Sequence, residues 1–158
     1  MDNFNHIETR KWFDELCGFK NYYICYKHGT KEPLHAFKDA ELGKEFTEKE
    51  ILRSQSFGVR CGLDNNLICI DCDFKKDKDA SDLPVEWRNT YTDDTKGGKH
   101  YFYIIPNGIP TYWRWGTKKT KYKFDLMINP NVAVSMTNSY GSNDKYYVNI
   151  KYMPPQII

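Results

Sequence analysis

The stretch LICIDCD, residues 67–73, constrains this chain more than any other. A short apolar run of this kind predicts a buried strand. Because side chains alternate along a strand, Asp71 and Asp73 would project from the same side, a few Å apart. Two carboxylates at that distance repel each other unless a positive charge lies between them. The fold must therefore bury the run and present its acidic end to a cation.

The length and composition predict one folded domain. The 158 residues suit a single domain, which we expect to span 1–158. A formal net charge of +2 neither requires nor excludes a polyanionic partner, whereas 16% aromatic residues argue against disorder. No apolar run is long enough to span a bilayer, and the first residues lack a signal-peptide core. We therefore expect an intracellular protein with no membrane partner.

The cysteines predict reduced, structural thiols. There are five, an odd number, and they are not spaced like a small disulfide framework. Cys69 and Cys72 form a C-x-x-C pair, but a strand would turn them to opposite faces. No second pair is present to complete a tetrahedral zinc site. Zinc and redox roles are therefore disfavoured.

Hydrophobic patterning predicts a mixture of helices and strands. Helices are expected at residues 6–18, closed by Gly18, and from Thr47, where TEKE satisfies a capping box. The polar turn at residues 64–66 predicts that the strands on either side form a hairpin. The charged run 74–82 reads as a solvated loop that leads to a short element near Trp87. Strands are expected at 22–26, 57–62, 67–73, 101–105, 122–128, 132–134 and 146–150.

Three of these strands carry unusual polar residues near their ends. Asp71 and Asp73 end one strand, His100 follows a double glycine at the start of another, and Asp125 lies within KFDLMI. Each has an ordinary explanation on its own, since a strand Asp often caps a turn and a His among aromatics is usually structural. Their order along the chain is more informative than any one of them.

In this order, IDCD, GGKH and FDL resemble the three motifs of the archaeo-eukaryotic primase superfamily: a D-x-D strand, a small-x-His strand and a later hydrophobic-Asp strand. The resemblance is strongest to the primase-polymerase domains that precede helicases in plasmid and viral replication proteins, and it covers roughly residues 20–150. It implies an α/β (α+β) fold, with an RRM-like catalytic unit in a mixed sheet and an N-terminal αβ unit beside it.

The chain departs from the family pattern at two places. Many relatives have Ser where this chain has Gly98. The segment NVAVSMTNSY lacks the proline pair often found near its serine, so Ser135 and Thr137 are candidate template or nucleotide contacts only.

The resemblance implies a DNA primase and polymerase that transfers nucleotides from NTPs or dNTPs on a single-stranded DNA template. Such chemistry needs two divalent cations, typically about 3.5–4 Å apart and held by hard oxygen ligands. Mg²⁺ or Mn²⁺ between the carboxylates would also allow both to remain ionised. The implied metal ligands are Asp71, Asp73 and Asp125, and the implied nucleotide-phosphate contacts are His100, Lys99, Gly98 and Gly97. Strand alternation turns Lys99 and His100 to opposite faces, which favours His100.

A basic and aromatic segment, WRWGTKKTKYK, is a candidate nucleic-acid contact. It combines phosphate-binding cations with rings that could stack on bases: Lys118, Lys119, Lys121, Lys123, Trp113 and Trp115. A surface loop with its tryptophans partly in the core explains the same residues equally well. The sequence leaves both interpretations open.

Two other functions fit parts of the sequence. In a PD-(D/E)xK nuclease, Asp73-Phe74-Lys75 would supply D-x-K, with Asp64 or Asp71 upstream, but the histidine and the later aspartate would have no role. A non-catalytic single-stranded nucleic-acid-binding module would need only the basic segment. A rolling-circle nickase is disfavoured because no paired-histidine metal motif is present. Pro154-Pro155 is typical of a domain edge, which is compatible with a helicase module following it.

Overall fold

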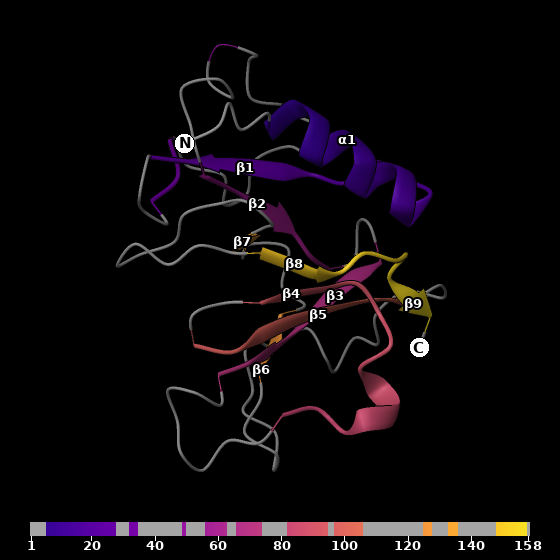
Figure 1. Cartoon of the computed structure of the whole chain (residues 1–158). Helices are drawn as coiled ribbons and strands as arrows, with labels where there is room; N and C mark the ends of the chain where they lie inside the picture. The colour runs from indigo at the N-terminus through magenta and orange to yellow at the C-terminus, as the bar shows by residue number, and fades with distance from the viewer. Residues whose placement is uncertain are drawn as a thin grey trace.

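The chain has a mixed α/β fold (Figure 1). The computed structural model describes residues 6–27, 32–34, 49, 56–62, 66–73, 82–94, 97–105, 125–127, 133–135 and 148–157. Within these residues there are one α-helix, one 3₁₀ helix and nine strands, which form two sheets. None of the described helices is both long and apolar enough to cross a membrane.

Helix α1 spans His6–Cys17 and packs through one apolar face, as the sequence predicts. Phe13 on that face is fully buried, and Trp12 and Leu16 pack beside it. The helix ends where Gly18 adopts a φ of 77°, a left-handed conformation that favours glycine. The Gly18 backbone N–H donates to the Asp14 carbonyl at 2.9 Å, which closes the last turn.

The smaller sheet has three strands in the order β1-β2-β7, with both pairs antiparallel. They are β1 (Tyr23–Tyr26), β2 (Ser56–Arg60) and β7 (Ala133–Ser135). Gly58 lies under the Tyr26 ring, where an added Cβ would be 3.0 Å from the ring carbon Cε2. Helix α1 lies alongside this sheet (Figure 1).

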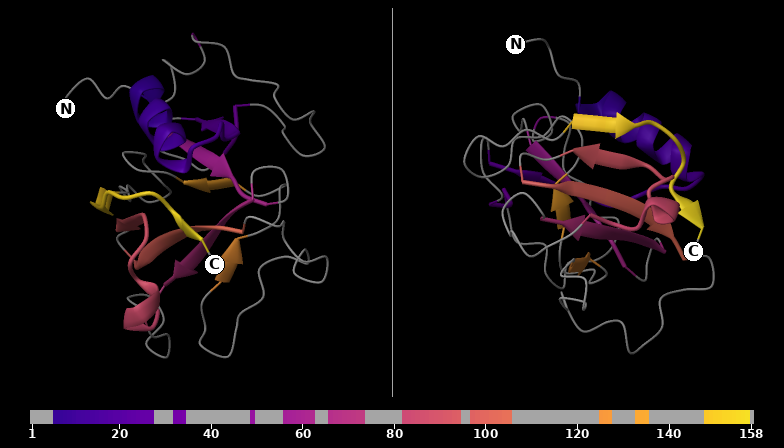
Figure 2. Two further views of the ribbon diagram at one scale, coloured as in Figure 1. Left: turned by 90° about the vertical axis from the view of Figure 1, so that its right-hand side faces the viewer. Right: turned by 60° about the horizontal axis from the view of Figure 1, so that its bottom comes forward.

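The larger sheet has six strands, five of them in the order β6-β3-β5-β4-β8 (Figure 2). Their bounds are β6 (Asp125–Met127), β3 (Leu67–Cys72), β5 (Lys99–Ile104), β4 (Thr92–Asp94) and β8 (Val148–Lys151). All of these neighbours are antiparallel, while the short strand β9 (Gln156–Ile157) pairs parallel with β5.

Strand β3 is buried on both of its faces, which explains its nearly continuous apolar sequence. On one face, Leu67 and Cys69 join a core cluster that includes residues of α1 and of the small sheet. On the other face, Ile68 and Ile70 pack in a second cluster with Leu83, which precedes the 3₁₀ helix η1 (Val85–Trp87). The two sheets and α1 thus share one core through the first cluster.

The predicted hairpin between residues 57–62 and 67–73 is wrong. Both segments are strands, but β2 belongs to the small sheet and β3 to the large one, and only an isolated bridge between Gly62 and Leu67 joins them. The physical reason is that β5 and β6 already occupy the two edges of β3. The turn residues Asp64 and Asn65 lie outside the described residues.

The other predicted strands are found within the part of each that the structure describes, and the short element near Trp87 is η1. The helix predicted from Thr47 lies outside the described residues, apart from Lys49. Two short strands, β4 and β9, are not predicted, because neither Thr-Asp-Asp nor Gln-Ile is long or apolar enough to show a strand pattern.

The five cysteines all lie in the described part of the chain, each is buried, and none forms a disulfide. Cys69 and Cys72 belong to different core clusters, as strand alternation predicts. Burial raises the pKa of Cys17 and of Cys72 to about 12. These thiols therefore stay protonated near neutral pH.

The end of α1 is fastened to β1 by the Asp14 carboxylate. Its Oδ1 accepts hydrogen bonds from the Asn21 backbone N–H (3.0 Å), from Asn21 Nδ2 (2.9 Å) and from the Tyr23 hydroxyl (2.8 Å). Asn21 and Tyr23 are both buried, so these donors have little access to water.

Replacing Asp14 should therefore destabilise the fold. We expect Asp14→Ala to lower the free energy of unfolding by about 2–4 kcal/mol, because both Asn21 donors lose this acceptor and the Tyr23 hydroxyl keeps only the longer 3.2 Å bond to the Arg10 carbonyl. Glu15→Ala is the matched control, since Glu15 is exposed on the same helix. Urea denaturation followed by circular dichroism measures both. Equal losses in the two variants would contradict this role.

Candidate active site

Four neighbouring strands of the large sheet carry one polar residue each at the same level. The register pairs Asp93 of β4 with His100 of β5, His100 with Asp71 of β3, and Asp71 with Asp125 of β6. Directly opposed residues of antiparallel strands point to the same face. The side chains of Asp93, His100 and Asp71 therefore form a polar row across one face of the sheet, and Asp125 is the next residue in the same register.

The polar row begins where the first core cluster ends. Along β3, Leu67 and Cys69 lie in that cluster, and Asp71 is the next residue on the same face. Along β5, Phe102 lies in the cluster and His100 follows on the same face. The His100 and Phe102 rings pack edge to face, with centroids 6.4 Å apart. The packed core thus fixes the backbone that carries the row.

Asp71 and His100 are in contact. The Nε2 atom of His100 lies 3.4 Å from Oδ1 of Asp71. The Asp71 side chain is 24% exposed, whereas that of His100 is only 8% exposed. The carboxylate therefore reaches solvent, and the imidazole beside it is held mostly within the protein.

Asp93 is not among the residues that the motifs predict. Its residue exposure is 0%, and it lies beside His100 on the side opposite Asp71. The sequence gives no local signal for this pairing, because a two-residue turn at Gly97-Gly98 would place position 95, not Asp93, opposite His100. Oδ2 of Asp93 and Nδ1 of His100 are buried atoms that make no hydrogen bond within the described residues, although both residues have other interactions.

Gly98 allows β5 to approach the acidic end of β3. An added Cβ would overlap the Cys72 carbonyl oxygen, and it would lie 2.7 Å from the Cys72 carbonyl carbon and 3.0 Å from the Asp73 Cα. Asp73 itself is half-buried and directly follows β3. Any side chain at position 98 would meet the same carbonyl, so this chain requires glycine there.

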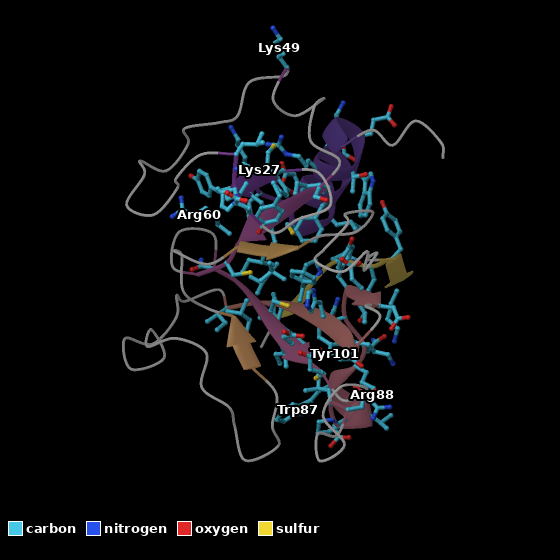
Figure 3. The ribbon with its side chains drawn as sticks, turned by 90° about the vertical axis from the view of Figure 1, so that its left-hand side faces the viewer. Lys27, Lys49, Arg60, Trp87, Arg88 and Tyr101 are labelled. Carbon is cyan, nitrogen blue, oxygen red and sulfur yellow. The ribbon has the colours of Figure 1, made fainter. Side chains whose placement is uncertain are left out.

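Lys99 lies on the face opposite the polar row. Its Nζ is 3.5 Å from Oδ2 of Asp82, and Arg88 Nε is also 3.5 Å from that oxygen. The other oxygen of Asp82, Oδ1, accepts a 2.8 Å hydrogen bond from the Tyr101 hydroxyl. Figure 3 shows Arg88 and Tyr101 at the same end of the molecule. Burial and the Asp82 carboxylate raise the pKa of Tyr101, so its hydroxyl stays protonated. That Lys99 contacts nucleotide phosphates stays a prediction.

Several predicted site residues lie outside the described part of the chain: Trp113, Trp115, Lys118, Lys119, Lys121, Lys123 and Thr137. Ser135 lies in β7, opposite Gly58 in the small sheet. Only the strand position of Asp125 is described, not its side chain. Among the described side chains, no three His, Cys, Asp or Glu residues form a group that could hold a metal ion.

Fold and site together define a mixed α/β domain with an acidic, histidine-containing row on an antiparallel sheet. Residues 17–152 match the family model for the bifunctional DNA primase/polymerase N-terminal domain (Prim-Pol), and the chain belongs to this family. The family predicted from the three motifs is thereby confirmed. No curated protein matches the chain significantly. Membership supports a DNA primase or polymerase activity, and hence nucleotidyl transfer.

The close contact at Gly98 leads to a test. We expect Gly98→Ala to lower the free energy of unfolding by about 3 kcal/mol or more, since backbone atoms of β3 block the new methyl group. Gly18→Ala is the comparison, because nothing lies within 4 Å of its added Cβ. Its left-handed backbone alone should cost about 1 kcal/mol. If denaturation shows Gly98→Ala to be the milder change, the close β3–β5 approach is wrong.

Proposed function

We propose that this chain is a primase-polymerase domain that transfers nucleotides from NTPs or dNTPs to a strand paired with a single-stranded DNA template. One observation carries the proposal: Asp71 is in register with both His100 and Asp125, inside the segment that matches the family. These are the residues that the three family motifs supply, and they come from three separate parts of the chain.

Asp71, Asp73 and Asp125 would hold Mg²⁺ or Mn²⁺. The donor set fits these ions, because they prefer carboxylate oxygens. The partial exposure of the Asp71 side chain leaves its carboxylate accessible from solvent, and Asp125 is its direct cross-strand neighbour. When bound, such ions neutralise the triphosphate and activate the attacking hydroxyl.

His100 would bind a phosphate of the incoming nucleotide. Its ring is restrained by Phe102 below it and by Asp71 beside it, so little freedom is lost when a ligand binds. The backbone N–H groups of Gly97 and Gly98 would contribute further phosphate contacts, with Lys99 as the weaker candidate.

The rest of the chain would support the same activity. The four antiparallel strands β6, β3, β5 and β4 are compatible with an RRM-like catalytic unit, and α1 with the small sheet would form the N-terminal αβ unit. The shared core cluster supports one domain over 1–158. The basic and aromatic segment would bind the template. We further propose that the domain acts on DNA inside the cell, with a fused or associated helicase as its partner.

The direct test is nucleotide incorporation. The domain is incubated with single-stranded DNA, labelled nucleotides and Mg²⁺ or Mn²⁺, and new labelled oligomers are the expected product. The double variant Asp71→Asn and Asp73→Asn should lose at least about a hundredfold in rate, because two metal ligands lose their charge. Asp94→Asn is the matched control, since it lies on the opposite sheet face from Asp93.

Other products would refute the proposal. A shortened template would indicate a nuclease, and an unchanged template with shifted mobility would indicate a binding module. Activity that is equal in the wild type and in the double aspartate variant would show that the carboxylates are not the metal ligands.

A second experiment tests His100. We expect His100→Gln to raise the nucleotide Kd by about tenfold to a hundredfold, the loss of one charge-assisted hydrogen bond, without changing Mn²⁺ affinity. Tyr101→Phe is the control, because Tyr101 faces the other side and bonds to Asp82. The nucleotide Kd of Tyr101→Phe should equal that of the wild type, although the melting temperature of this variant should fall. An unaltered Kd in His100→Gln would remove this residue from the site.

A further inference from the structure

Asp93 has no explanation in the packing of the core. It is fully buried in β4, on the same face as the first core cluster, which contains Tyr91 and Phe102. An apolar side chain at this position would extend that cluster. Burying a carboxylate is unfavourable unless a positively charged or hydrogen-bonding group accompanies it. The side chain next to it in the row is His100.

His100 therefore lies between two carboxylates of different exposure. β5 runs between β3 and β4, so Asp71 is on one side of the imidazole and Asp93 on the other. Nε2 is the nitrogen near Asp71, at 3.4 Å. The opposite edge of the ring carries Nδ1, which is buried. The Phe102 ring packs edge to face against the imidazole and offers it an apolar surface.

We propose that Asp93 is a positioning residue for His100: its buried carboxylate attracts the ring edge that carries Nδ1 and keeps Nε2 turned toward Asp71 and the nucleotide. A carboxylate on that side accepts a hydrogen bond from a ring N–H, and such a partner fixes the orientation in which Nδ1 faces Asp93 and Nε2 faces Asp71. Asp93 would not touch the substrate, because it is fully buried. The functional consequence of this inference rests on the proposed function.

The ring itself can be observed without any catalytic assay. Nitrogen-15 NMR of the imidazoles reports the surroundings and hydrogen bonding of each ring nitrogen, and the spectrum of His100→Gln assigns the His100 signals. We expect Asp93→Asn, which keeps the shape and removes the charge, to shift both His100 nitrogen signals. Asp94→Asn is the control, because Asp94 is the next residue in β4 and pairs with Lys99 on the opposite face. Unchanged His100 signals in Asp93→Asn would overturn the proposal.

Kinetics then test whether the effect passes through His100. Asp93→Asn should raise the nucleotide KM by about tenfold in the wild-type background, and should add nothing in a His100→Gln background. If Asp93→Asn raised the nucleotide KM equally in the wild-type and His100→Gln backgrounds, the positioning role would be overturned. If the wild type incorporates no nucleotide, the proposed function fails instead, and the NMR comparison still decides the role of Asp93.

A second variant tests whether the role of Asp93 is purely structural. Asp93→Ser removes the charge with a smaller side chain and serves as the second variant. If neither Asp93→Asn nor Asp93→Ser has the circular dichroism spectrum of the folded protein, Asp93 is needed for folding and the proposal is wrong. Folded variants with altered His100 signals support it.

Discussion

The site depends on how β3 is held. This strand is paired along both edges, by β5 and β6, and it is buried on both faces. The backbone at Asp71 therefore cannot move without disturbing two ladders and two core clusters. Repulsion between neighbouring carboxylates would otherwise push the strands apart. Rigid support of this kind keeps charged groups in place before a ligand arrives, which is what electrostatic catalysis requires.

The two faces of the large sheet have separate electrostatic tasks. On the face of the polar row, Asp71, His100 and Asp93 follow directly from the core, and Asp71 reaches solvent. On the other face, the Asp82 carboxylate pairs with Lys99 and Arg88 and accepts a hydrogen bond from the Tyr101 hydroxyl. These contacts connect the segment around η1 to β5. Lys99 is one residue from His100 in sequence, yet its charge serves this second face.

The amino-acid sequence predicts the features that depend on the local pattern of apolar and polar residues. The apolar run identified β3, and alternation correctly separated Cys69 from Cys72 and Lys99 from His100. Strand partners were not predictable in this way, so the hairpin before β3 was wrong. β4 was missed because Thr-Asp-Asp has no strand signature, and Asp93 was missed with it. The need for Gly98 arises from a contact with Cys72 that exists only in the folded sheet.

The central claim is that the carboxylates at the end of β3 and in β6 hold a divalent cation. Paramagnetic broadening of backbone amide signals by substoichiometric Mn²⁺ locates such an ion directly. The signals of Asp71, Asp73 and Asp125 should broaden first, with that of His100, while those around Asp14 and Asp82 stay sharp. First broadening near Asp82 or Asp14, or uniform weak broadening across the protein, would contradict the claim.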